Sequence, residues 1–386
     1  MGIQFLDLGK QPLANGFLTE KEFDNEFFFN LTAQFDTHNY LVSLGEFVPP
    51  EKMFNESYAY TSSCSQTMID HFMFAADRIK NMWIADLNAY ILEIGSNDGV
   101  FIRNFNPHYT TAVEPCANFA KITNKLGYKT YNEFWSMGLS EKIVKEKGRQ
   151  NIVYSANCMC HIQDVQEAFS AVHNVLHPSG RFIFEDPSLL DVIKNDSYDQ
   201  FYDEHAHIFS LIALEKLLNK SGFYIDKVEH LDTHGGSNRI YATKFPSKNK
   251  DLQHLFDIEY GYGLDKLITY FMFAERVQES KNHLLELFYR IRSQYKHIIG
   301  YGATSKSSVV YNYCGITPVH LDYIIDTTPV KQGKFSPGTH IPIIAPQKIT
   351  QEYAFLGAWN YKDEICSKEK DRKFKFITHV PKVTIF

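Results

Sequence analysis

Apolar and polar positions along this chain change their spacing several times, and each change marks a different kind of structure. From residue 89 onward, the short apolar runs AYILEI, TTAVEP, NIVYSA and GRFIFED alternate with segments long enough for helices. This alternation is typical of a parallel, doubly wound α/β sheet. A predicted helix at 207–222 and two predicted strands, at 223–231 and 237–245, follow these units and complete a central domain over 86–250.

The segments on either side of this central domain have other patterns. Residues 1–85 contain short β-rich pieces and a helical segment at 67–82 but no dominant period, which predicts a short, irregular N-terminal cap. Between 251 and 297, apolar residues recur at helical spacing, which predicts one or two long connecting helices. Residues 298–386 again show strand–turn–helix units, so we expect a second, smaller Rossmann-like domain there.

Composition and charge exclude several classes of protein. The 39 basic and 45 acidic residues give a net charge of −6 without a long Lys/Arg block, so we expect no nucleic-acid partner. No apolar run approaches the ~20 residues needed to cross a membrane, and the first residues lack the pattern of a secretion signal. We therefore expect a cytoplasmic protein with no membrane partner. The pattern does not indicate an oligomeric state.

The turn after the first strand of the central domain is a candidate cofactor site. In ILEIGSNDG, Glu93 ends the strand, and Gly95, Asn97, Asp98 and Gly99 form the turn behind it. Glycines permit positive φ and let a ligand approach the backbone, and the following helix terminus offers free N–H groups. A carboxylate at the strand end can hold an ammonium group, which S-adenosylmethionine has and a dinucleotide lacks. The simpler alternative is that these glycines only form a turn.

A second acidic residue strengthens the cofactor interpretation. About twenty residues further on, the next strand ends in Glu114 and Pro115, and a carboxylate there suits the paired hydroxyls of a ribose. Together with Glu93, this spacing favours S-adenosylmethionine over NAD.

Long stretches in every part of the chain match one known family, in the family's order. They are LDLGKQPLANGFL (6–18), SYAYTSSCSQTM (57–68), LEIGSNDGVF (92–101), VEPCANFA (113–120), FEDPSLLDVI (184–193), SYDQFYDEHAHIFS (197–210), HGGSNRIY (234–241), GYGATSKSSVVYNYCGI (300–316) and IIDTTPVKQGKFSPGTHIPI (324–343). Through these stretches the chain resembles the bacterial deoxysugar C-methyltransferases, which act on nucleotide-linked 4-keto sugars.

The resemblance implies three parts: an N-terminal zinc-binding region, a central S-adenosylmethionine domain and a C-terminal Rossmann-like domain that completes the sugar-nucleotide site. The zinc region departs from the family pattern. The chain begins at about the point where the first cysteine pair of the family has already passed, and the second pair falls on Asp36 and Asn39. Structural zinc needs about four ligands, and His38 is the single Cys or His among residues 1–60. We therefore expect no metal and a cap held by packing alone.

Methylation of carbon requires a base that removes a proton beside a ketone, and donors that stabilise the enolate oxygen. The resemblance implies catalytic roles for Tyr202, Glu204, His205, His161 and Tyr60. His205 titrates near neutrality and is a candidate base or acid, Glu204 is a candidate to orient it, and Tyr202 is a candidate base or hydrogen-bond donor. Which of Tyr202, His205 and His161 takes the proton stays open.

Two of these candidates have simpler alternatives. His161 follows Cys158 and Cys160, but no fourth ligand lies nearby in the sequence, which favours packing over a metal site. Tyr58 and Tyr60 are candidates for a lid over the site or for the core of the cap, and we favour Tyr60 as the functional residue.

The C-terminal domain carries a second candidate turn, in GYGATSKS (300–307). It follows a strand and opens a helix, so backbone N–H groups and a lysine can hold a pyrophosphate, although an empty turn of a nucleotide fold has the same pattern. The candidate substrate-binding residues are Gly300, Gly302, Ala303, Lys306, Asp326 and His234.

The sequence therefore predicts an S-adenosylmethionine-dependent C-methyltransferase. The expected reaction is deprotonation and methylation of the carbon next to the ketone, C3, of a nucleotide-linked 4-keto-6-deoxyhexose. The alternatives are an O- or N-methyltransferase of a nucleotide sugar, an NAD-dependent oxidoreductase that uses residues 300–307, and a non-catalytic sugar-nucleotide-binding protein.

Overall fold

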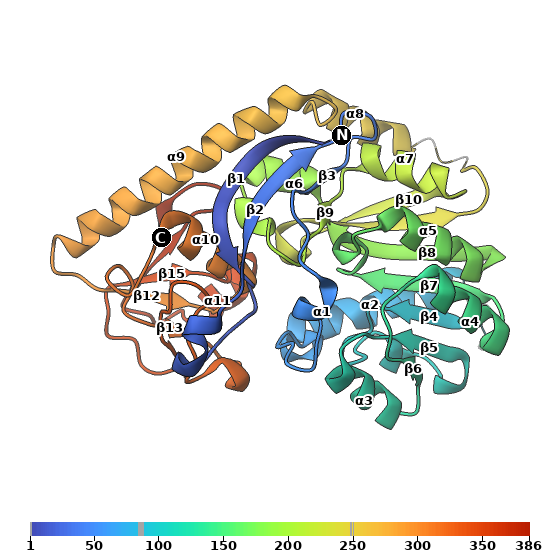
Figure 1. The fold of residues 1–386 in the computed structure, drawn as a ribbon, viewed down its shortest axis with the longest axis horizontal. Helices are drawn as coiled ribbons and strands as arrows, with labels where there is room; N and C mark the ends of the chain where they lie inside the picture. The colour runs from blue at the N-terminus through green and yellow to red at the C-terminus, as the bar shows by residue number, and fades with distance from the viewer. Residues whose placement is uncertain (1, 84–88, 248, 250) are drawn as a thin grey trace.

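Three β-sheets organise the chain in the computed structural model, which describes residues 2–83, 89–247, 249 and 251–386. In Figure 1 the N-terminal sheet lies between the central sheet and the C-terminal sheet, and helix α9 runs along the outer side of the C-terminal half. The predicted α/β fold class, with two separate Rossmann-like sheets, is confirmed. Among the described residues, no helix is long and apolar enough to cross a membrane.

The central sheet has the strand order β10-β11-β8-β7-β4-β5-β6. Strands β4 to β8 are parallel to one another, whereas β11 runs antiparallel to both of its neighbours. Its strands are β4 (Ile91–Ile94), β5 (Thr110–Val113), β6 (Lys129–Tyr131), β7 (Gln150–Ala156), β8 (Leu176–Pro187), β10 (Tyr224–Leu231) and β11 (Ser237–Thr243). The surrounding helices are α2 (Gln66–Trp83), α3 (Ala117–Lys125), α4 (Met137–Lys147), α5 (Val165–Val175), α6 (Leu189–Asn195) and α7 (Leu211–Lys220).

Alternating side chains of these strands pack on two different sets of helices, which explains their nearly continuous apolar sequence. Ile91 and Ile152 contact residues of α2 in one hydrophobic cluster, whereas Leu92 and Val153 belong to the cluster that contains α4 and α5. Because both faces are covered, the carboxyl ends of the strands form the edge where a ligand binds in this kind of fold.

The N-terminal segment is more regular than its sequence predicts. It forms a sheet of the order β1-β2-β3-β9, with strands β1 (Ile3–Pro12), β2 (Phe28–Phe35), β3 (Val42–Leu44) and β9 (His207–Ile208), followed by α1 (Pro50–Met53). The prediction of an irregular cap is wrong because two register shifts in β1, between Gln4 and Leu6 and between Asp7 and Lys10, interrupt the apolar–polar alternation. The start of the predicted helix at 207–222 is also strand, since β9 completes this sheet.

The C-terminal sheet has the order β14-β13-β12-β15-β16-β17, and every pair is parallel except β16 with β17. Its elements are β12 (Ile298–Tyr301), β13 (Ile324–Ile325), β14 (Ile343–Ile344), β15 (Tyr353–Leu356), β16 (Lys375–Thr378) and β17 (Thr384–Ile385), with helices α10 (Ser305–Cys314) and α11 (Lys362–Lys368).

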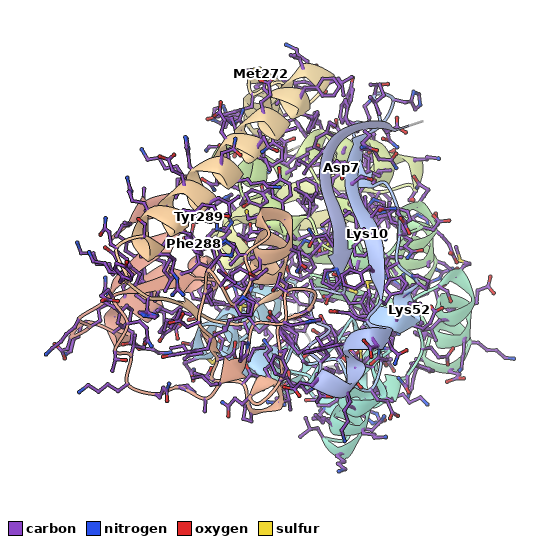
Figure 2. All side chains as sticks on the ribbon, turned by 60° about the vertical axis from the view of Figure 1, so that its left-hand side comes forward. Asp7, Lys10, Lys52, Met272, Phe288 and Tyr289 are labelled. Atoms are coloured by element: carbon purple, nitrogen blue, oxygen red, sulfur yellow. The ribbon has the colours of Figure 1, made fainter. Side chains whose placement is uncertain are left out.

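Two connecting helices, α8 (Asp251–Gly261) and α9 (Leu267–Arg292), join the central and C-terminal sheets. Figure 2 labels Met272, Phe288 and Tyr289 along α9. Phe288 is fully buried, whereas Met272 and Tyr289 are more than half exposed. One face of α9 therefore packs on β1 and α10 while the other lies in solvent.

The segment between β1 and β2 holds the two larger parts together. The backbone N–H of Ala14 donates to the carboxylate of Asp203 in the central part (2.9 Å), and the hydroxyl of Ser308 in α10 donates to the carbonyl of Ala14 (2.9 Å). Leu18 and Phe335 exchange backbone hydrogen bonds further along. Packing and hydrogen bonds therefore fix the N-terminal sheet against both Rossmann-like parts.

His207 of β9 makes a pH-dependent contribution to this arrangement. It is buried, its Nδ1 accepts from the hydroxyl of Ser43 (2.8 Å), and its Nε2 donates to the carbonyl of Gln163 (3.1 Å). Burial lowers the pKa of His207 to about 4. Between this value and the usual pKa near 6.5, the unfolded chain binds a proton that the folded chain does not, so acid favours unfolding.

We expect His207→Gln to weaken the acid sensitivity of folding. From pH 7 to pH 4, the difference in free energy of unfolding between wild type and variant should change by up to ~3 kcal/mol in favour of the variant. Denaturant titrations at a series of pH values measure this change, with His108→Gln, an exposed position, as the matched control. Parallel pH profiles for wild type and His207→Gln would contradict the assignment.

Candidate active site

A cavity of about 540 Å³ opens where the three parts of the chain meet. Its walls include Gly95 from the cofactor turn (residues 95–99), Tyr58 from the N-terminal segment, His205 from the loop 202–205, and Lys306 from the start of α10. We call residues 202–205 the base loop. The structure thus brings together, in one cavity, motifs that lie more than two hundred residues apart in the sequence.

The cofactor turn lies at the carboxyl ends of β4 and β5, as predicted from the sequence. Gly95 has φ = +76°, and a Cβ at this position would lie 2.7 Å from Sγ of Cys158, so only glycine fits. The carboxylate of Glu114 accepts hydrogen bonds from the backbone N–H groups of Asn97 (2.7 Å) and Cys116 (2.8 Å). Each oxygen keeps a further lone pair that a hydroxyl donor can use.

The predicted cofactor residues divide into two groups. Gly95, Asn97, Glu114 and Pro115 line the cavity, whereas Glu93, Asp98 and Gly99 do not. Each of these three residues has other surroundings.

Glu93 is 3% exposed, and its Oε2 has no hydrogen-bond partner among the described residues. Burial, and then the neighbouring Glu114, raise its pKa well above the ordinary value. Asp98 pairs with Arg103 (3.5 Å), and Gly99 packs against the side chain of Thr123. Contact between Glu93 and an ammonium group therefore stays a prediction.

The residues that line this end of the cavity fit S-adenosylmethionine. A glycine with positive φ leaves the backbone open to close approach, and the Glu114 carboxylate stands where ribose hydroxyls need an acceptor. The remaining wall includes the apolar side chains Ile94, Val113 and Phe134, which suit the purine ring.

The base loop holds Tyr202 and His205 in direct contact. His205 is 4% exposed, and its Nδ1 lies 2.7 Å from the carbonyl oxygen of Gln200, so this nitrogen carries the hydrogen and donates it. Its Nε2 consequently has a free lone pair, which accepts from the hydroxyl of Tyr202 (2.8 Å). Burial, and then the neighbouring groups His161 and Lys306, hold the pKa of His205 well below its usual value of 6.5, so the ring is neutral at pH 7.

Glu204 lies in the same loop but does not orient His205, contrary to the prediction from the sequence. Its Oε1 accepts from the side-chain amide of Asn15 (2.7 Å), and its Oε2 accepts from the hydroxyl of Tyr58 (2.7 Å). The backbone carbonyl of Gln200 takes the orienting role instead. Gln200 ends the short helical turn at 198–200, just before the base loop.

The N-terminal segment therefore contributes Asn15 and Tyr58 to the site. Tyr60, the functional residue predicted from the sequence, also lines the cavity but is 39% exposed. Its backbone carbonyl accepts a hydrogen bond from the side chain of Asn97 (3.1 Å). Asn15 was missed, although it lies in the stretch LANGFL that matches the family. Its contact with Glu204 joins positions 189 residues apart, so no local pattern indicates it.

We expect Tyr58→Phe to destabilise the protein because it removes one of the two donors to the buried carboxylate of Glu204. Loss of a hydrogen bond to a buried charged group typically costs about 1–3 kcal/mol in the free energy of unfolding. Urea denaturation measures the difference, and Tyr295→Phe, at a position that is 93% exposed, is the matched control. Equal stability of the two variants would show that Glu204 does not depend on Tyr58.

His161 stacks on the ring of His205 at a centroid distance of 5.4 Å and on Phe54 at the same distance. Its Nε2 has no hydrogen-bond partner among the described residues, and burial lowers its pKa to about 4. Candidate ligand atoms of Cys160, His161 and His205 lie within 4.8 Å of one another. His205 is thus a third candidate ligand, which the sequence does not place beside Cys160. Burial raises the pKa of the Cys160 thiol well above its usual value, which opposes the thiolate form that binds metals.

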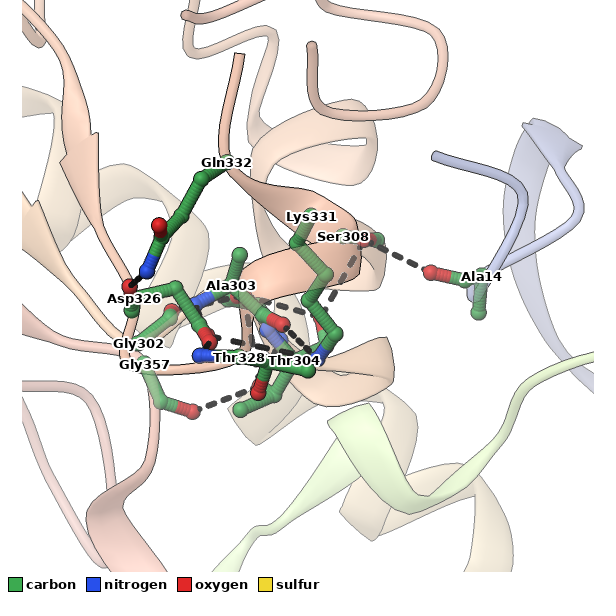
Figure 3. Close-up of polar contacts among 11 residues, drawn as sticks. Ala14, Gly302, Ala303, Thr304, Ser308, Asp326, Thr328, Lys331, Gln332 and Gly357 are labelled. Atoms are coloured by element: carbon green, nitrogen blue, oxygen red, sulfur yellow. Dashed lines mark hydrogen bonds and ion pairs between the residues drawn. The ribbon is translucent and has the colours of Figure 1, made fainter. Parts of the chain in front are cut away.

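Hydrogen bonds from neighbouring segments hold the turn before α10, as Figure 3 shows. The carboxylate of Asp326 accepts from the backbone N–H groups of Ala303 (2.7 Å) and Thr328 (2.8 Å), and the ammonium of Lys331 donates to the carbonyl of Ala303 (2.7 Å). The hydroxyl of Thr304 donates to the carbonyl of Gly357 (2.8 Å). Asp326 therefore builds the turn from behind, and its contact with a sugar hydroxyl has no support from this geometry.

The predicted substrate residues also divide into two groups. Lys306 and His234 line the cavity, whereas Gly300, Gly302, Ala303 and Asp326 do not. His234 has φ = +57°, its carbonyl accepts from the side chain of Gln200 (2.6 Å), and burial lowers its pKa to about 3. Thr327, Thr328 and Lys331 line the cavity beside Lys306 and were not singled out from the sequence.

Three family models match consecutive parts of the chain. One described as a putative zinc binding domain matches residues 2–54, one described as a methyltransferase domain matches 69–228, and one described as a C-methyltransferase C-terminal domain matches 232–381. C-methyltransferase NovU of Streptomyces niveus is 29% identical over 392 residues, which cover 98% of this chain and 93% of that protein.

Solved structures also resemble part of the chain. A possible histamine N-methyltransferase of Thermotoga maritima is 18% identical with a TM-score of 0.34, and covers 46% of this chain and 92% of its own. Magnesium protoporphyrin IX methyltransferase of Synechocystis, solved with bound S-adenosylmethionine, is 11% identical with a TM-score of 0.34, and covers 46% and 82%.

The methyltransferase domain model, the sheet order and the glycine turn with Glu114 define the class of protein: it is an S-adenosylmethionine-dependent methyltransferase. Within that class, the C-methyltransferase domain model over residues 232–381 and the match to NovU over 98% of the chain show similarity to C-methyltransferases, which confirms the resemblance seen in the sequence.

The residues that match the putative zinc binding domain do not fit a zinc ion. His38 is the single Cys or His among residues 1–60, and zinc in structural sites takes four such ligands. At one position expected for a family cysteine, the side chain of Asp36 accepts from the backbone N–H of His38 (2.8 Å). The matched segment thus lacks the cysteine ligands of that region.

Proposed function

We propose that this enzyme methylates the carbon next to the ketone, C3, of a nucleotide-linked 4-keto-6-deoxyhexose. One observation carries the proposal: the cofactor turn, the base loop and the start of α10 open onto the same cavity. A methyl donor held by one Rossmann-like part and a sugar nucleotide held by the other then meet at Tyr202 and His205.

S-adenosylmethionine, when bound, supplies a methyl group on a positively charged sulfur, which a carbon nucleophile attacks. The residues of this chain create that nucleophile. The hydroxyl oxygen of Tyr202 takes the proton from the carbon beside the ketone while its own proton passes to Nε2 of His205. Burial raises the pKa of Tyr202 well above 10, so the phenol needs this transfer to act as a base.

The electrons balance along this path. The C–H bonding pair becomes the C=C bond of an enolate, and the C=O π pair moves onto the ketone oxygen. The enolate then re-forms its carbonyl as the carbon bonds to the methyl carbon, and the C–S bonding pair stays on sulfur. The proton on His205 returns through Tyr202 to solvent, which restores the neutral pair.

In this proposal, the nucleotide of the substrate binds against the C-terminal Rossmann-like domain. Ser305, Thr327, Thr328 and Lys331 line the cavity there, and hydroxyls, free N–H groups at the start of α10 and an ammonium suit a pyrophosphate. The turn residues Gly300, Gly302, Ala303 and Asp326 support these groups from behind.

The test is mass spectrometry of thymidine-, guanosine-, cytidine- and uridine-linked 4-keto-6-deoxyhexoses after incubation with the enzyme and deuteromethyl S-adenosylmethionine. We expect one nucleotide series to gain a deuteromethyl group on carbon, and its α-proton to exchange with solvent deuterium. A deuteromethyl group found on oxygen or nitrogen, without α-proton exchange, would replace the proposal by O- or N-methylation.

A further inference from the structure

Lys306 is a buried lysine without a counter-ion. It is the second residue of α10, its side chain is 7% exposed, and it lines the cavity. In the described part of the chain, no carboxylate lies within 4.0 Å of its Nζ, and no hydrogen bond from that atom is found. Burying an ammonium in this way is costly, so an anion supplied by the substrate is the natural partner.

Glu204, one of the two carboxylates that act electrostatically on Lys306, is hydrogen-bonded to other side chains. Both of its oxygens already accept hydrogen bonds, from Asn15 and from Tyr58. Asp199 is similarly engaged, since its carboxylate accepts from the indole of Trp359 (2.6 Å) and lies 3.3 Å from His379. Lys306 is thus close enough to both carboxylates to interact electrostatically but is paired with neither.

Lys306 lines the same cavity as the base loop residues Tyr202 and His205. Its charge acts on the rings of His205 and His234, which both line the same cavity. Lys331, by contrast, lies over the ring of Phe17 and donates to the carbonyl of Ala303 on the nucleotide side. These two lysines of the cavity lining therefore have different surroundings.

A substrate of the proposed kind brings two anionic centres: the pyrophosphate and the oxygen of the enolate. The enolate oxygen is one C–C and one C–O bond away from the carbon whose proton Tyr202 and His205 remove. A cation beside the base loop is therefore placed for the enolate, whereas Lys331 and the hydroxyls of Thr327 and Thr328 are placed for the pyrophosphate.

We propose that Lys306 is a catalytic residue that donates a hydrogen bond from its ammonium to the ketone oxygen and stabilises the charge that develops there on enolisation. This role rests on the proposed function and revises the sequence-based prediction of a pyrophosphate contact. Lys306 keeps its proton throughout: the C=O π pair moves to the oxygen beside Nζ and returns when the new C–C bond forms. A fixed cation at a developing oxyanion contributes most in a site that excludes water.

The test compares Lys306→Met with Lys331→Met in two assays. One is the first-order rate of α-proton exchange into solvent deuterium at saturating keto sugar. The other is the dissociation constant of the free nucleoside diphosphate that corresponds to the keto sugar used in the exchange assay. We expect Lys306→Met to lower the exchange rate 10²- to 10³-fold with less than about threefold change in the dissociation constant. Lys331→Met should instead weaken binding of the diphosphate at least about tenfold.

Controls separate catalysis from folding. Lys370→Met removes an exposed charge and should change neither assay. Lys306→Met should unfold at the same temperature as wild type or at a higher one in the absence of substrate, since the variant has no unpaired buried charge. A second variant, Lys306→Arg, keeps the charge and should retain more exchange activity than Lys306→Met.

Several outcomes would overturn the inference. A Lys306→Met enzyme with wild-type exchange, or one whose defect is confined to diphosphate binding, would assign this lysine to the pyrophosphate. Unfolding of both Lys306 variants would show a structural role. Absence of exchange in the wild type with every keto sugar would instead refute the proposed function itself, and the role of Lys306 with it.

Discussion

Replacing His205 by asparagine is expected to abolish α-proton exchange, with a loss of at least about 10³-fold, because the asparagine side chain has no nitrogen that can take the proton of Tyr202. S-adenosylmethionine should still bind with an affinity within about threefold of wild type, since Gly95, Asn97 and Glu114 are untouched. Exchange is followed by proton NMR in deuterium oxide, and cofactor binding by isothermal titration calorimetry.

Tyr202→Phe and His161→Asn decide whether the proton path is correct. Tyr202→Phe should be as severe as His205→Asn, because the hydroxyl that links the carbon to Nε2 is missing. His161→Asn should have a smaller effect, since His161 contacts His205 by stacking alone. Exchange that survives in Tyr202→Phe and is lost in His161→Asn would transfer the role of base to His161.

Replacing Gly95 by alanine is expected to remove cofactor binding, with a loss of at least about 10²-fold in affinity for S-adenosylmethionine. The added Cβ would lie 2.7 Å from Sγ of Cys158, and alanine is strained at φ = +76°. The nucleoside diphosphate site, formed by the other Rossmann-like part, should be unaffected. Calorimetric titration of the variant with each ligand measures both affinities separately.

Gly138→Ala is the matched control for this change. Gly138 lies in α4, and no atom is found within 4 Å of the position of its added Cβ. Alanine there should leave both affinities unchanged and stabilise the helix slightly. Wild-type cofactor affinity in Gly95→Ala would show that the turn at 95–99 is not the binding site for S-adenosylmethionine.

Local sequence patterns were sufficient where a structural element is determined by its own residues. The central strands are buried on both faces, so their apolar runs are long and easy to recognise, and the turn after β4 was located with its glycines. The helix at 67–82 also agrees closely with α2. Short β-rich pieces were expected in the N-terminal segment, but their regular sheet was missed because the register shifts in β1 remove the alternation on which such a prediction depends.

On the long connecting helix, helical spacing predicted the correct period but not every buried residue. Phe288 is buried, whereas the apolar residues Ile268 and Phe271 are exposed. At the start of α9 the fully buried residues are Tyr270 and Phe273, so the exposed pair lies on another side of the helix, and helical spacing alone does not say which side faces the core.

The amino-acid sequence by itself determined the class of fold, the position of the cofactor turn and the family, because each of these depends on residues that are near one another in the chain. Only the tertiary structure decided which side chains share the cavity. It replaced Glu204 by the carbonyl of Gln200 as the group that orients His205, brought Asn15 and Tyr58 to Glu204, and left Asp326 outside the cavity lining. The physical reason is that hydrogen bonds and unpaired charges depend on distances across packed surfaces, and these distances are set by contacts between segments far apart in the sequence.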